Sequence, residues 1–381
     1  PPPVDHPGRI ARWTSRLAGA ALIVFLMAAL VTTAYKVARG DLDLFPQGLG
    51  WAAFLNGDTT RELAHALSNA PLPAESARLE RGFSWLVAGD LGPRVRQGCP
   101  GWLFLSDEFM RYPHAEDNAQ SRAREVLHVK NALGRRHIAL VVAVVPDKSR
   151  IAAAHLCGLR RPAASAARLD DWVASLRAEG VDAINLAPVL AAVGDGAEDR
   201  QGAYLRTDTH WNEAGAQAAA EAVARAIRRA GITVTPRTDW TVHSNVESRA
   251  GDLVRLAGLD WLPARLQPPR DRTRVSVFTP TQPAAAAAGA DDLFGDDNLP
   301  NAALIGTSFS RNSNFVPFLE SALRARIPDF AKDGGDFAGA ANAYFGSAAF
   351  RQTPPRLVIW EIPERVIEAP RNGDAITLRQ P

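Results

Sequence analysis

The feature that most constrains the fold is an uninterrupted apolar run, IALVVAVV, at residues 138–145. A strand with one face in solvent alternates apolar and polar side chains. This run is apolar at every position and rich in β-branched residues, which favour strands. Such a strand needs cover on both of its faces. The run therefore predicts a strand within a parallel sheet that lies between two layers of helices.

Amphipathic and apolar segments alternate beyond residue 98, in a chain of 381 residues that is long enough for one large domain with appendages or for two smaller ones. The patterns predict helices over 121–137, 167–180 and 212–231, and further strands over 181–186, 301–305 and 355–362. Gly134 and Gly231 are expected helix ends, and Asn212 an expected N-cap. The alternation predicts an α/β fold whose sites lie at the C-terminal ends of the strands.

An uncharged apolar run, Leu17–Ala34, stands near the N-terminus. As a helix it spans roughly 27 Å, about the thickness of the hydrocarbon core of a bilayer. Basic residues flank it, with Arg9, Arg12 and Arg16 before it and Lys36 and Arg39 after it. The larger basic cluster favours a cytoplasmic N-terminus. We expect a signal-anchor with the rest of the chain exported, while a cleaved signal peptide and a buried core helix are the alternatives.

These patterns divide the chain into five parts. We expect a cytoplasmic tail (1–16), a transmembrane helix (17–36), a membrane-proximal helical region (37–97), the main α/β domain (98–370) and a C-terminal tail (371–381). Residues 279–300 are rich in Ala, Pro, Gly and Asp and are expected to form a surface loop. The stretch from about 236 to 278 does not alternate cleanly and receives no assignment.

The composition excludes some function classes. With 43 basic and 41 acidic residues, the formal net charge is +2, which gives no electrostatic case for nucleic-acid binding. The histidines and cysteines show no metal-site spacing, so we expect neither a metal nor another cofactor. Export would place Cys99 and Cys157 in an oxidising compartment, where a disulfide is expected and two free thiols are the alternative.

Two short motifs carry candidate chemistry. In TDTHW, at residues 207–211, Asp208 and His210 stand just before a predicted helix. Taken alone, the motif fits a capped turn equally well. In GTSFS, at residues 306–310, Ser308 directly follows a buried strand, where nucleophiles sit on strand-to-helix turns. The pattern departs from G-x-S-x-G, and a capping serine is the alternative.

Each motif supplies what the other lacks. A serine hydroxyl is a poor nucleophile until a base removes its proton, and a carboxylate orients an imidazole for that task. We therefore predict a catalytic triad in which Ser308 is the nucleophile, His210 the base and Asp208 its orienting partner.

The motifs together resemble the alginate O-acetyltransferases with SGNH-hydrolase-like domains. The resemblance covers about residues 98–368 and rests on TDTHWNEAGA, GTSFSRNSNF and LVIWEIPER, with GWLFL and VVPDKSRI upstream. It implies a three-layer α/β/α fold with a permuted motif order, and a periplasmic enzyme anchored in the inner membrane by one helix. It also implies acetyl transfer to a secreted, alginate-like polysaccharide through Asp208, His210 and Ser308.

Other matched residues are weaker candidates. Asn314 is a candidate oxyanion donor beside the Ser308 backbone N–H, or else a turn residue. Arg311 could meet an anionic sugar or simply lie exposed, and Lys148 could be a ligand or a charged loop residue. Trp211 is expected to pack or to wall the pocket. For the WEIPER residues Glu361, Glu364 and Arg365, we expect a structural ion-pair network.

The resemblance also implies partners. Because the exported compartment holds no acetyl-CoA, the expected acetyl donor is a membrane-bound O-acyltransferase, alongside other polysaccharide synthesis and export proteins. Three alternatives stay open: an acetyl-esterase with the same triad, a non-catalytic scaffold of an export complex, and transfer to another acceptor such as cellulose or peptidoglycan.

Overall fold

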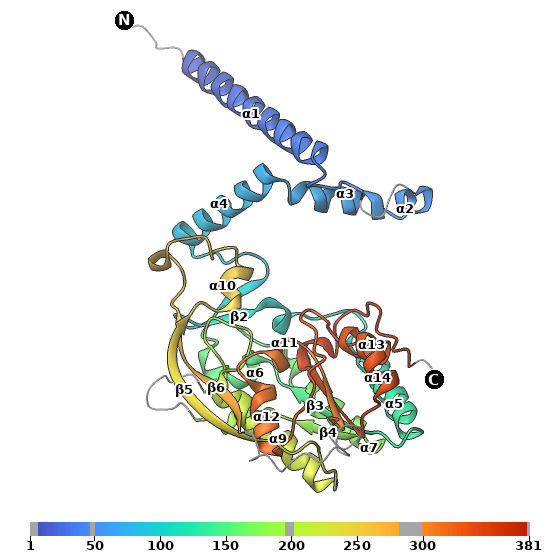
Figure 1. The fold of residues 1–381 in the computed structure, drawn as a ribbon. Helices are drawn as coiled ribbons and strands as arrows, with labels where there is room; N and C mark the ends of the chain where they lie inside the picture. The colour runs from blue at the N-terminus through green and yellow to red at the C-terminus, as the bar shows by residue number, and fades with distance from the viewer. Residues whose placement is uncertain (1–6, 46–49, 195–201, 282–298, 379–381) are drawn as a thin grey trace, which may run out of the picture. The chain divides into compact units, whose positions relative to one another are not determined.

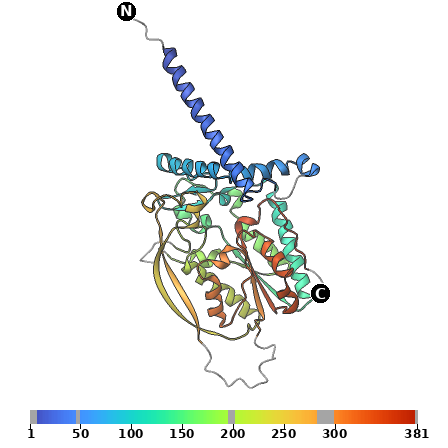
Figure 2. The same ribbon diagram turned by 45° about the horizontal axis from the view of Figure 1, so that its top comes forward.

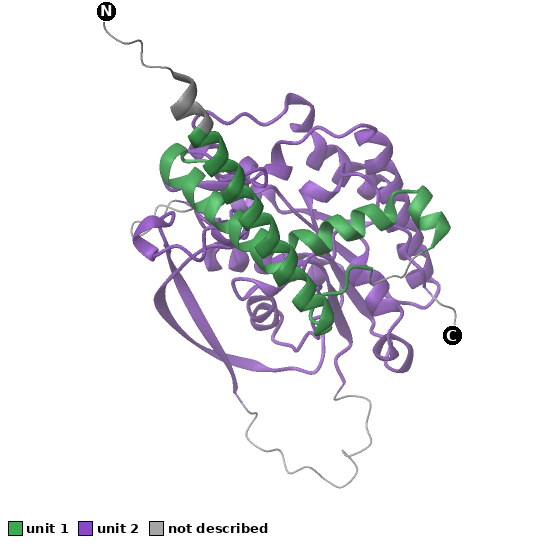
Figure 3. Cartoon of the chain, turned by 90° about the horizontal axis from the view of Figure 1, so that it is seen from above, with its two compact units in different colours: residues 1–90 green, residues 91–381 purple. Residues whose placement is uncertain are grey.

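The computed structural model describes residues 7–45, 50–194, 202–281 and 299–378. The chain divides into two compact units, residues 1–90 and residues 91–381, which Figure 3 colours separately. The larger unit thus begins at Leu91, ahead of the domain start expected at residue 98. The first six residues of the expected cytoplasmic tail, most of the 279–300 segment and the last three residues of the C-terminal tail lie outside the described residues.

The described part of the smaller unit is helical. Helix α1 (Pro7–Ala38) contains the apolar run, and its Trp13–Ala38 portion is long and apolar enough to cross a membrane, a test that N-terminal signal sequences also pass. Three further helices follow, α2 (Trp51–Leu55), α3 (Asp58–Ser68) and α4 (Pro71–Ala88). Helix α4 ends at Ala88 and is capped by Gly89, whose left-handed φ of 67° suits a glycine.

The larger unit is built on a four-stranded sheet (Figure 1). Its strands are β3 (Ala139–Val145), β4 (Asp182–Asn185), β7 (Ala302–Ile305) and β8 (Leu357–Pro363). They lie in the order β4-β3-β8-β7, and every neighbouring pair is parallel. The parallel sheet predicted from the apolar runs is confirmed.

Helices cover both faces of the sheet, as the β3 pattern requires. Val142 and Val144 point into one core, whereas Val141 and Ala143 point into the other, and all four side chains are fully buried. The first core includes side chains from α5 (Ala115–Gly134), α7 (Arg168–Ala178) and α13 (Gly339–Phe345). The second includes side chains from α8 (Ala187–Ala191), α9 (Glu213–Arg229) and α12 (Phe315–Leu323). The result is a three-layer α/β/α unit.

Helix α9 begins and ends where the sequence predicts. The Asn212 side chain accepts a hydrogen bond of 3.0 Å from the Gly215 N–H, so it caps the helix N-terminus. Gly231, two residues past the last helical residue, has a φ of 72°. The cap matters for the site, because it fixes the direction in which the DTHW segment enters the helix.

A long hairpin occupies the stretch left unassigned above. Strands β5 (Asp239–Arg249) and β6 (Asp271–Thr281) pair antiparallel over their whole length and form a ribbon at one side of the unit (Figure 2). Most β5 side chains are exposed, so the strand lacks the alternating apolar pattern by which strands are predicted. The strand from Asp239 to Arg249 is therefore one that the sequence pattern does not reveal.

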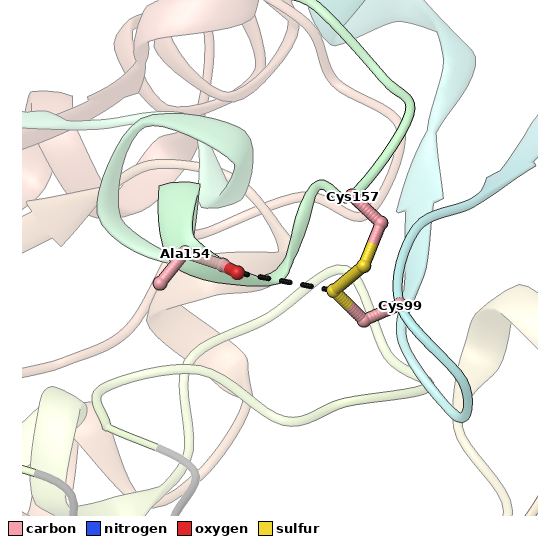
Figure 4. The surroundings of a disulfide bond; sticks show 3 residues. All are labelled: Cys99, Ala154 and Cys157. Carbon is pink, nitrogen blue, oxygen red and sulfur yellow. Dashed lines mark hydrogen bonds between the residues drawn. A yellow bond between two sulfur atoms is a disulfide. The ribbon is translucent and has the colours of Figure 1, made fainter.

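A disulfide joins Cys99 to Cys157, with the two Cα atoms 5.1 Å apart (Figure 4). Between the two cysteines lie β2 (Leu103–Leu105), which pairs antiparallel with β1 (Val95–Gln97), and the short helix α6 (Lys148–Ile151). The Cys99 N–H also donates to the His155 carbonyl at 2.8 Å. Of the two outcomes left open for the cysteines, the structure contains the disulfide.

The remaining short helices of the larger unit are α10 (Asp252–Leu256), α11 (Ser308–Arg311) and α14 (Ala348–Gln352). Short 3₁₀ turns lie at Ser106–Phe109, Ala153–His155, Ala163–Ser165, Ala264–Leu266 and Glu364–Val366.

Candidate active site

The Asp208 and His210 side chains are joined within one tight loop. An isolated bridge between Tyr204 and Trp211 closes this loop just before α9. Asp208 Oδ1 accepts a hydrogen bond of 2.6 Å from His210 Nδ1 and another of 3.0 Å from the His210 backbone N–H. The carboxylate thus fixes both the backbone and the ring of His210.

Ser308 reaches this pair from the other motif. Strand β7 ends at Ile305, and Ser308 is the first residue of α11. Its Oγ lies 2.8 Å from His210 Nε2. Asp208 and His210 are buried, whereas Ser308 is partly exposed. The structure therefore brings the three predicted residues into a continuous hydrogen-bonded chain whose serine end is open to solvent.

Asp208 is held in its ionised form. Its second oxygen, Oδ2, accepts hydrogen bonds from Arg249 Nη2 at 3.0 Å and from the Asp252 backbone N–H at 3.1 Å. Burial by itself would raise the pKa of Asp208, but the hydrogen bonds from His210 and the charge of Arg249 hold that pKa well below its usual range. A carboxylate in this state supports a positive charge on the imidazole.

A second carboxylate, Asp252, lies close to the ring. Its Oδ1 accepts from the Thr209 N–H at 2.7 Å, and its Oδ2 accepts from the Thr209 hydroxyl at 2.6 Å. Asp252 Oδ2 is 3.6 Å from His210 Nδ1. Burial, together with the nearby charge of Asp208, raises the pKa of Asp252.

Asp208, His210 and Asp252 place one potential ligand atom each within 4.8 Å of one another, a spacing that could hold a metal ion. Their atoms already have partners. His210 Nδ1 is hydrogen-bonded to Asp208, and both Asp252 oxygens accept from Thr209. We therefore interpret the group as a hydrogen-bond network around the imidazole.

The turn that carries Ser308 is fastened to the neighbouring strand by Glu361. Glu361 Oε2 accepts from the Thr307 N–H at 2.6 Å and from the Ser310 hydroxyl at 3.0 Å, and the Thr307 hydroxyl donates to the same carboxylate. A Cβ on Gly306 would lie 2.6 Å from Glu361 Oε2, so only glycine fits at that position. Burial raises the pKa of Glu361. The glutamate thus holds one residue on each side of Ser308, Thr307 before it and Ser310 after it.

Lys148 is fully buried behind the loop and does not face solvent. Its Nζ donates to the backbone carbonyls of Leu103 at 2.5 Å, Arg206 at 2.8 Å and Asp208 at 2.9 Å. Burial lowers the pKa of Lys148 to about 8. Three acceptors match the three N–H bonds of an ammonium group. Lys148 is therefore a support for the Asp208 segment, and the geometry favours neither of the two roles expected for it.

Asn314 and Arg311 lie differently from their expected roles. The Asn314 amide donates to Glu213 Oε1 at 2.6 Å and to the Ser276 carbonyl at 2.7 Å. Both of its N–H bonds are thereby used, which speaks against an oxyanion role. Arg311 is exposed, with Asp333 at 3.9 Å as an ion-pair partner. This position leaves its guanidinium accessible at the surface.

Trp211 packs under the site. Its ring is fully buried, stacks on Phe315 with centroids 5.0 Å apart, and meets the edge of Phe309 at 5.1 Å. Phe309 also contacts the His210 ring at 5.0 Å. Of the two roles expected for Trp211, the structure therefore shows packing, against Phe309 and Phe315.

The expected ion-pair network in WEIPER forms around Glu364. This buried carboxylate pairs with Arg150 at 2.6 Å, Arg161 at 2.9 Å and Arg168 at 3.2 Å. Burial alone would raise the pKa of Glu364, but the hydrogen bond from Arg150 and the three positive charges lower it to about 2. The network holds the chain that follows β8. Glu361 instead accepts hydrogen bonds from Thr307 and Ser310. The Arg365 guanidinium lies over the Phe309 ring, 5.2 Å from the ring centroid. Of the three residues, Glu364 is therefore the one for which the structure shows the expected ion pairs.

Sequence patterns did not point to Arg249 or Asp252. Both approach Asp208 from more than 40 positions further along the chain, from the end of β5 and the start of α10. An Asp at the first position of a helix is common and carries no signal of its own. These contacts depend on tertiary structure and had no local signature.

Replacing Lys148 tests its supporting role. Lys148→Met keeps the side-chain length but leaves three carbonyls without their donor. We expect the free energy of unfolding to fall by about 2–4 kcal/mol. Lys130→Met is the matched control, because Lys130 donates to one carbonyl, that of Glu179, through a solvent-exposed hydrogen bond. Its expected loss is under about 0.5 kcal/mol. Urea unfolding followed by tryptophan fluorescence measures both, and equal losses would contradict the assignment.

Comparison with known proteins identifies the family. Residues 95–364 match the model of the family described as "SGNH hydrolase-like domain, acetyltransferase AlgX". The chain is 33% identical over 321 residues to a probable alginate O-acetylase AlgJ of Pseudomonas aeruginosa, covering 82% of this chain and 81% of that protein. It is 30% identical over 297 residues to the alginate biosynthesis protein AlgX of Pseudomonas putida, covering 75% and 57%.

A solved structure agrees as well. The O-acetyltransferase domain of Pseudomonas putida AlgJ superposes with a TM-score of 0.63 at 27% identity and covers 75% of this chain and 96% of that one. The family match spans well over half of the chain and contains both motif loops. The resemblance noted from the motifs is thereby confirmed, and the chain belongs to the AlgX family of acetyltransferases with an SGNH-hydrolase-like domain.

Proposed function

We propose that this protein is an alginate O-acetyltransferase, which moves acetyl groups onto hydroxyls of alginate or an alginate-like exopolysaccharide through an acyl-serine intermediate. The observation that carries the proposal is the hydrogen-bonded chain from Asp208 through His210 to Ser308, at 2.6 Å and 2.8 Å. Relatives named as alginate O-acetylases support the reaction class and the acceptor.

The first half-reaction loads the serine. His210 Nε2 takes the Ser308 proton as Oγ attacks the acetyl carbonyl of the donor ester. The bond from the acyl carbon to the donor oxygen then breaks, and the imidazolium returns the proton to that leaving oxygen. Asp208 stabilises the imidazolium, since its pKa is held well below the usual range. An acetyl ester on Ser308 remains.

The second half-reaction unloads it. A sugar hydroxyl occupies the place of the leaving group, His210 removes its proton, and the sugar oxygen attacks the acyl-serine carbonyl. The ester bond to Ser308 breaks, and Oγ recovers the proton from His210. The Ser308 backbone N–H, at the start of α11, is the donor that we assign to the developing oxyanion, because the Asn314 amide is committed to Glu213 and Ser276.

We also propose a location and partners. Helix α1 would anchor the chain in the inner membrane, with the larger unit in the periplasm, where the Cys99–Cys157 disulfide would persist. Likeness to an alginate biosynthesis protein supports association with other proteins of that process. Within that group, a membrane-bound O-acyltransferase would supply the acetyl group.

Ser308→Ala should abolish the covalent intermediate while the protein stays folded. Incubation of wild type with an activated acetyl ester should add one acetyl group, seen by intact mass, and turnover of the variant should fall on the order of 10⁴- to 10⁶-fold. Ser175→Ala, on the remote helix α7, is the control and should be acetylated like wild type. Unchanged acetylation of Ser308→Ala would remove this serine from the mechanism.

The same reaction separates transferase from esterase. With alginate oligosaccharides added, the proposal requires acetylated oligosaccharides among the products. Release of acetate alone, with the sugars unmodified at saturating concentration, would instead establish the acetyl-esterase that shares this triad.

The two carboxylates beside His210 allow a matched comparison. Asp208→Asn removes the charge that orients Nδ1 and should lower turnover about 10⁴-fold, as the corresponding change does in serine proteases. Asp252→Asn changes a carboxylate that lies 3.6 Å away and is bound to Thr209, so we expect a loss of under about tenfold.

Non-additivity provides the second readout. Asp208→Asn combined with His210→Ala should be little worse than His210→Ala alone, because the two residues act as one unit. Melting temperatures control for folding. Near-normal turnover of Asp208→Asn would return this loop to a simple capped turn.

A reporter fusion tests the topology. Alkaline phosphatase fused after Pro381 is active only in an oxidising compartment, so the fusion should be active in cells if the larger unit is exported. Activity of a cytoplasmic reporter at the same site would overturn both the location and the origin of the disulfide.

A further inference from the structure

The helices that follow α1 carry large apolar side chains on their surface. In α4, Leu79, Phe83, Leu86 and Val87 are 52–69% exposed. Their spacing of four, three and one residues places all four on one face of the helix. Monomeric soluble proteins rarely leave such a contiguous stripe in water.

Helix α2 has a second patch of the same kind. Trp51, Phe54 and Leu55 are 57–76% exposed, and the Trp51 and Phe54 rings stack with centroids 5.8 Å apart. The spacing of three and four residues again selects one face. Both patches include aromatic rings, which are enriched where protein meets the interface of a bilayer.

The charged residues of α4 do not cover this apolar face but lie beside it. Arg78 pairs with Glu75 at 2.9 Å, and Arg81 pairs with Glu80. Helix α4 therefore has an apolar face and a charged face, and on the charged face these acidic and basic side chains pair with one another. An amphipathic helix of this type lies in the plane of a membrane surface.

The position of α4 in the chain decides between lipid and other partners. Helices α1 and α4 pack against each other within the smaller unit, and α1 contains the segment long and apolar enough to span a bilayer. Helix α4 contacts α1 directly, and only 12 residues separate α2 from the end of α1 at Ala38. Both helices are therefore held close to the segment that would span the bilayer.

We propose that α2 and α4 lie in the lipid surface, with the apolar faces of Leu79–Val87 and Trp51–Leu55 in the acyl-chain boundary. The smaller unit would then hold the exported part by two membrane contacts, one spanning and one peripheral. This inference rests on the proposed anchor but is independent of the acetyl-transfer chemistry.

Photocrosslinking in the full-length protein tests it. The protein is reconstituted in vesicles of phosphatidylethanolamine and phosphatidylglycerol, with p-benzoylphenylalanine introduced one position at a time. The variant Phe83→p-benzoylphenylalanine should form lipid adducts, detected by mass of the tryptic peptide. Ala77, exposed on the opposite face of α4, is the matched control and should give at least tenfold fewer.

The same crosslinker at Leu26, within α1, distinguishes failure of the peripheral contact from failure of the membrane anchor. Lipid adducts at position 26 without any at position 83 would overturn the peripheral contact while leaving the anchor intact. Adducts from position 83 to a protein segment, in this chain or in another, would overturn it as well. Absence of lipid adducts at position 26 would contradict the anchor itself.

Discussion

Two buried carboxylates at the end of the central strand β8 organise the larger unit. A charge taken out of water is destabilising by several kcal/mol unless hydrogen-bond donors and opposite charges surround it. Glu364 meets this requirement with three arginines, which draw the segments after β3 and before α7 together. Glu361 meets it with Thr307 and Ser310, and so fastens the turn of β7 that holds Ser308. The hydrogen bonds that satisfy Glu361 thus hold the turn in which Ser308 lies.

The other half of the site is held in a similar way from behind. Lys148 follows the end of β3, and its ammonium group gathers three carbonyls, that of Asp208 among them. Arg249 reaches the Asp208 carboxylate from the β5–β6 hairpin. Parallel strands bring their C-terminal ends to one edge of the sheet, so the loops meet there whatever their order along the chain. The histidine motif and the serine motif therefore meet, although His210 and Ser308 are 98 positions apart along the chain.

Local pattern predicted what depends on local pattern. The β3 run is apolar throughout because both of its faces are buried, so it indicated the layered fold. The Asp208–His210 spacing and the strand before Ser308 are also short-range features, and both could be recognised in the sequence. The β5 strand was not predicted, because most of its side chains are exposed and show no alternation of apolar and polar residues. Asn314 stands six residues after Ser308, yet its φ of 57° and its hydrogen bond to Glu213 direct the amide away from that serine. Contacts such as Arg249 to Asp208 join distant segments, which no sequence window contains.

Two carboxylates, Asp208 and Asp252, lie near the His210 imidazole, and their environments decide which of them is its ionised partner. Asp208 has three kinds of donor, from His210, Arg249 and a backbone N–H, so its pKa lies well below the usual range. Asp252 is partly buried beside that charge. Desolvation and the charge of Asp208 together raise the pKa of Asp252, and its oxygens accept hydrogen bonds from Thr209. The environments thus push the two pKa values apart, which is how neighbouring carboxyl groups acquire separate roles. His210 therefore faces one firmly ionised partner at Nδ1, and Asp252 acts by holding Thr209, and with it the loop, in place.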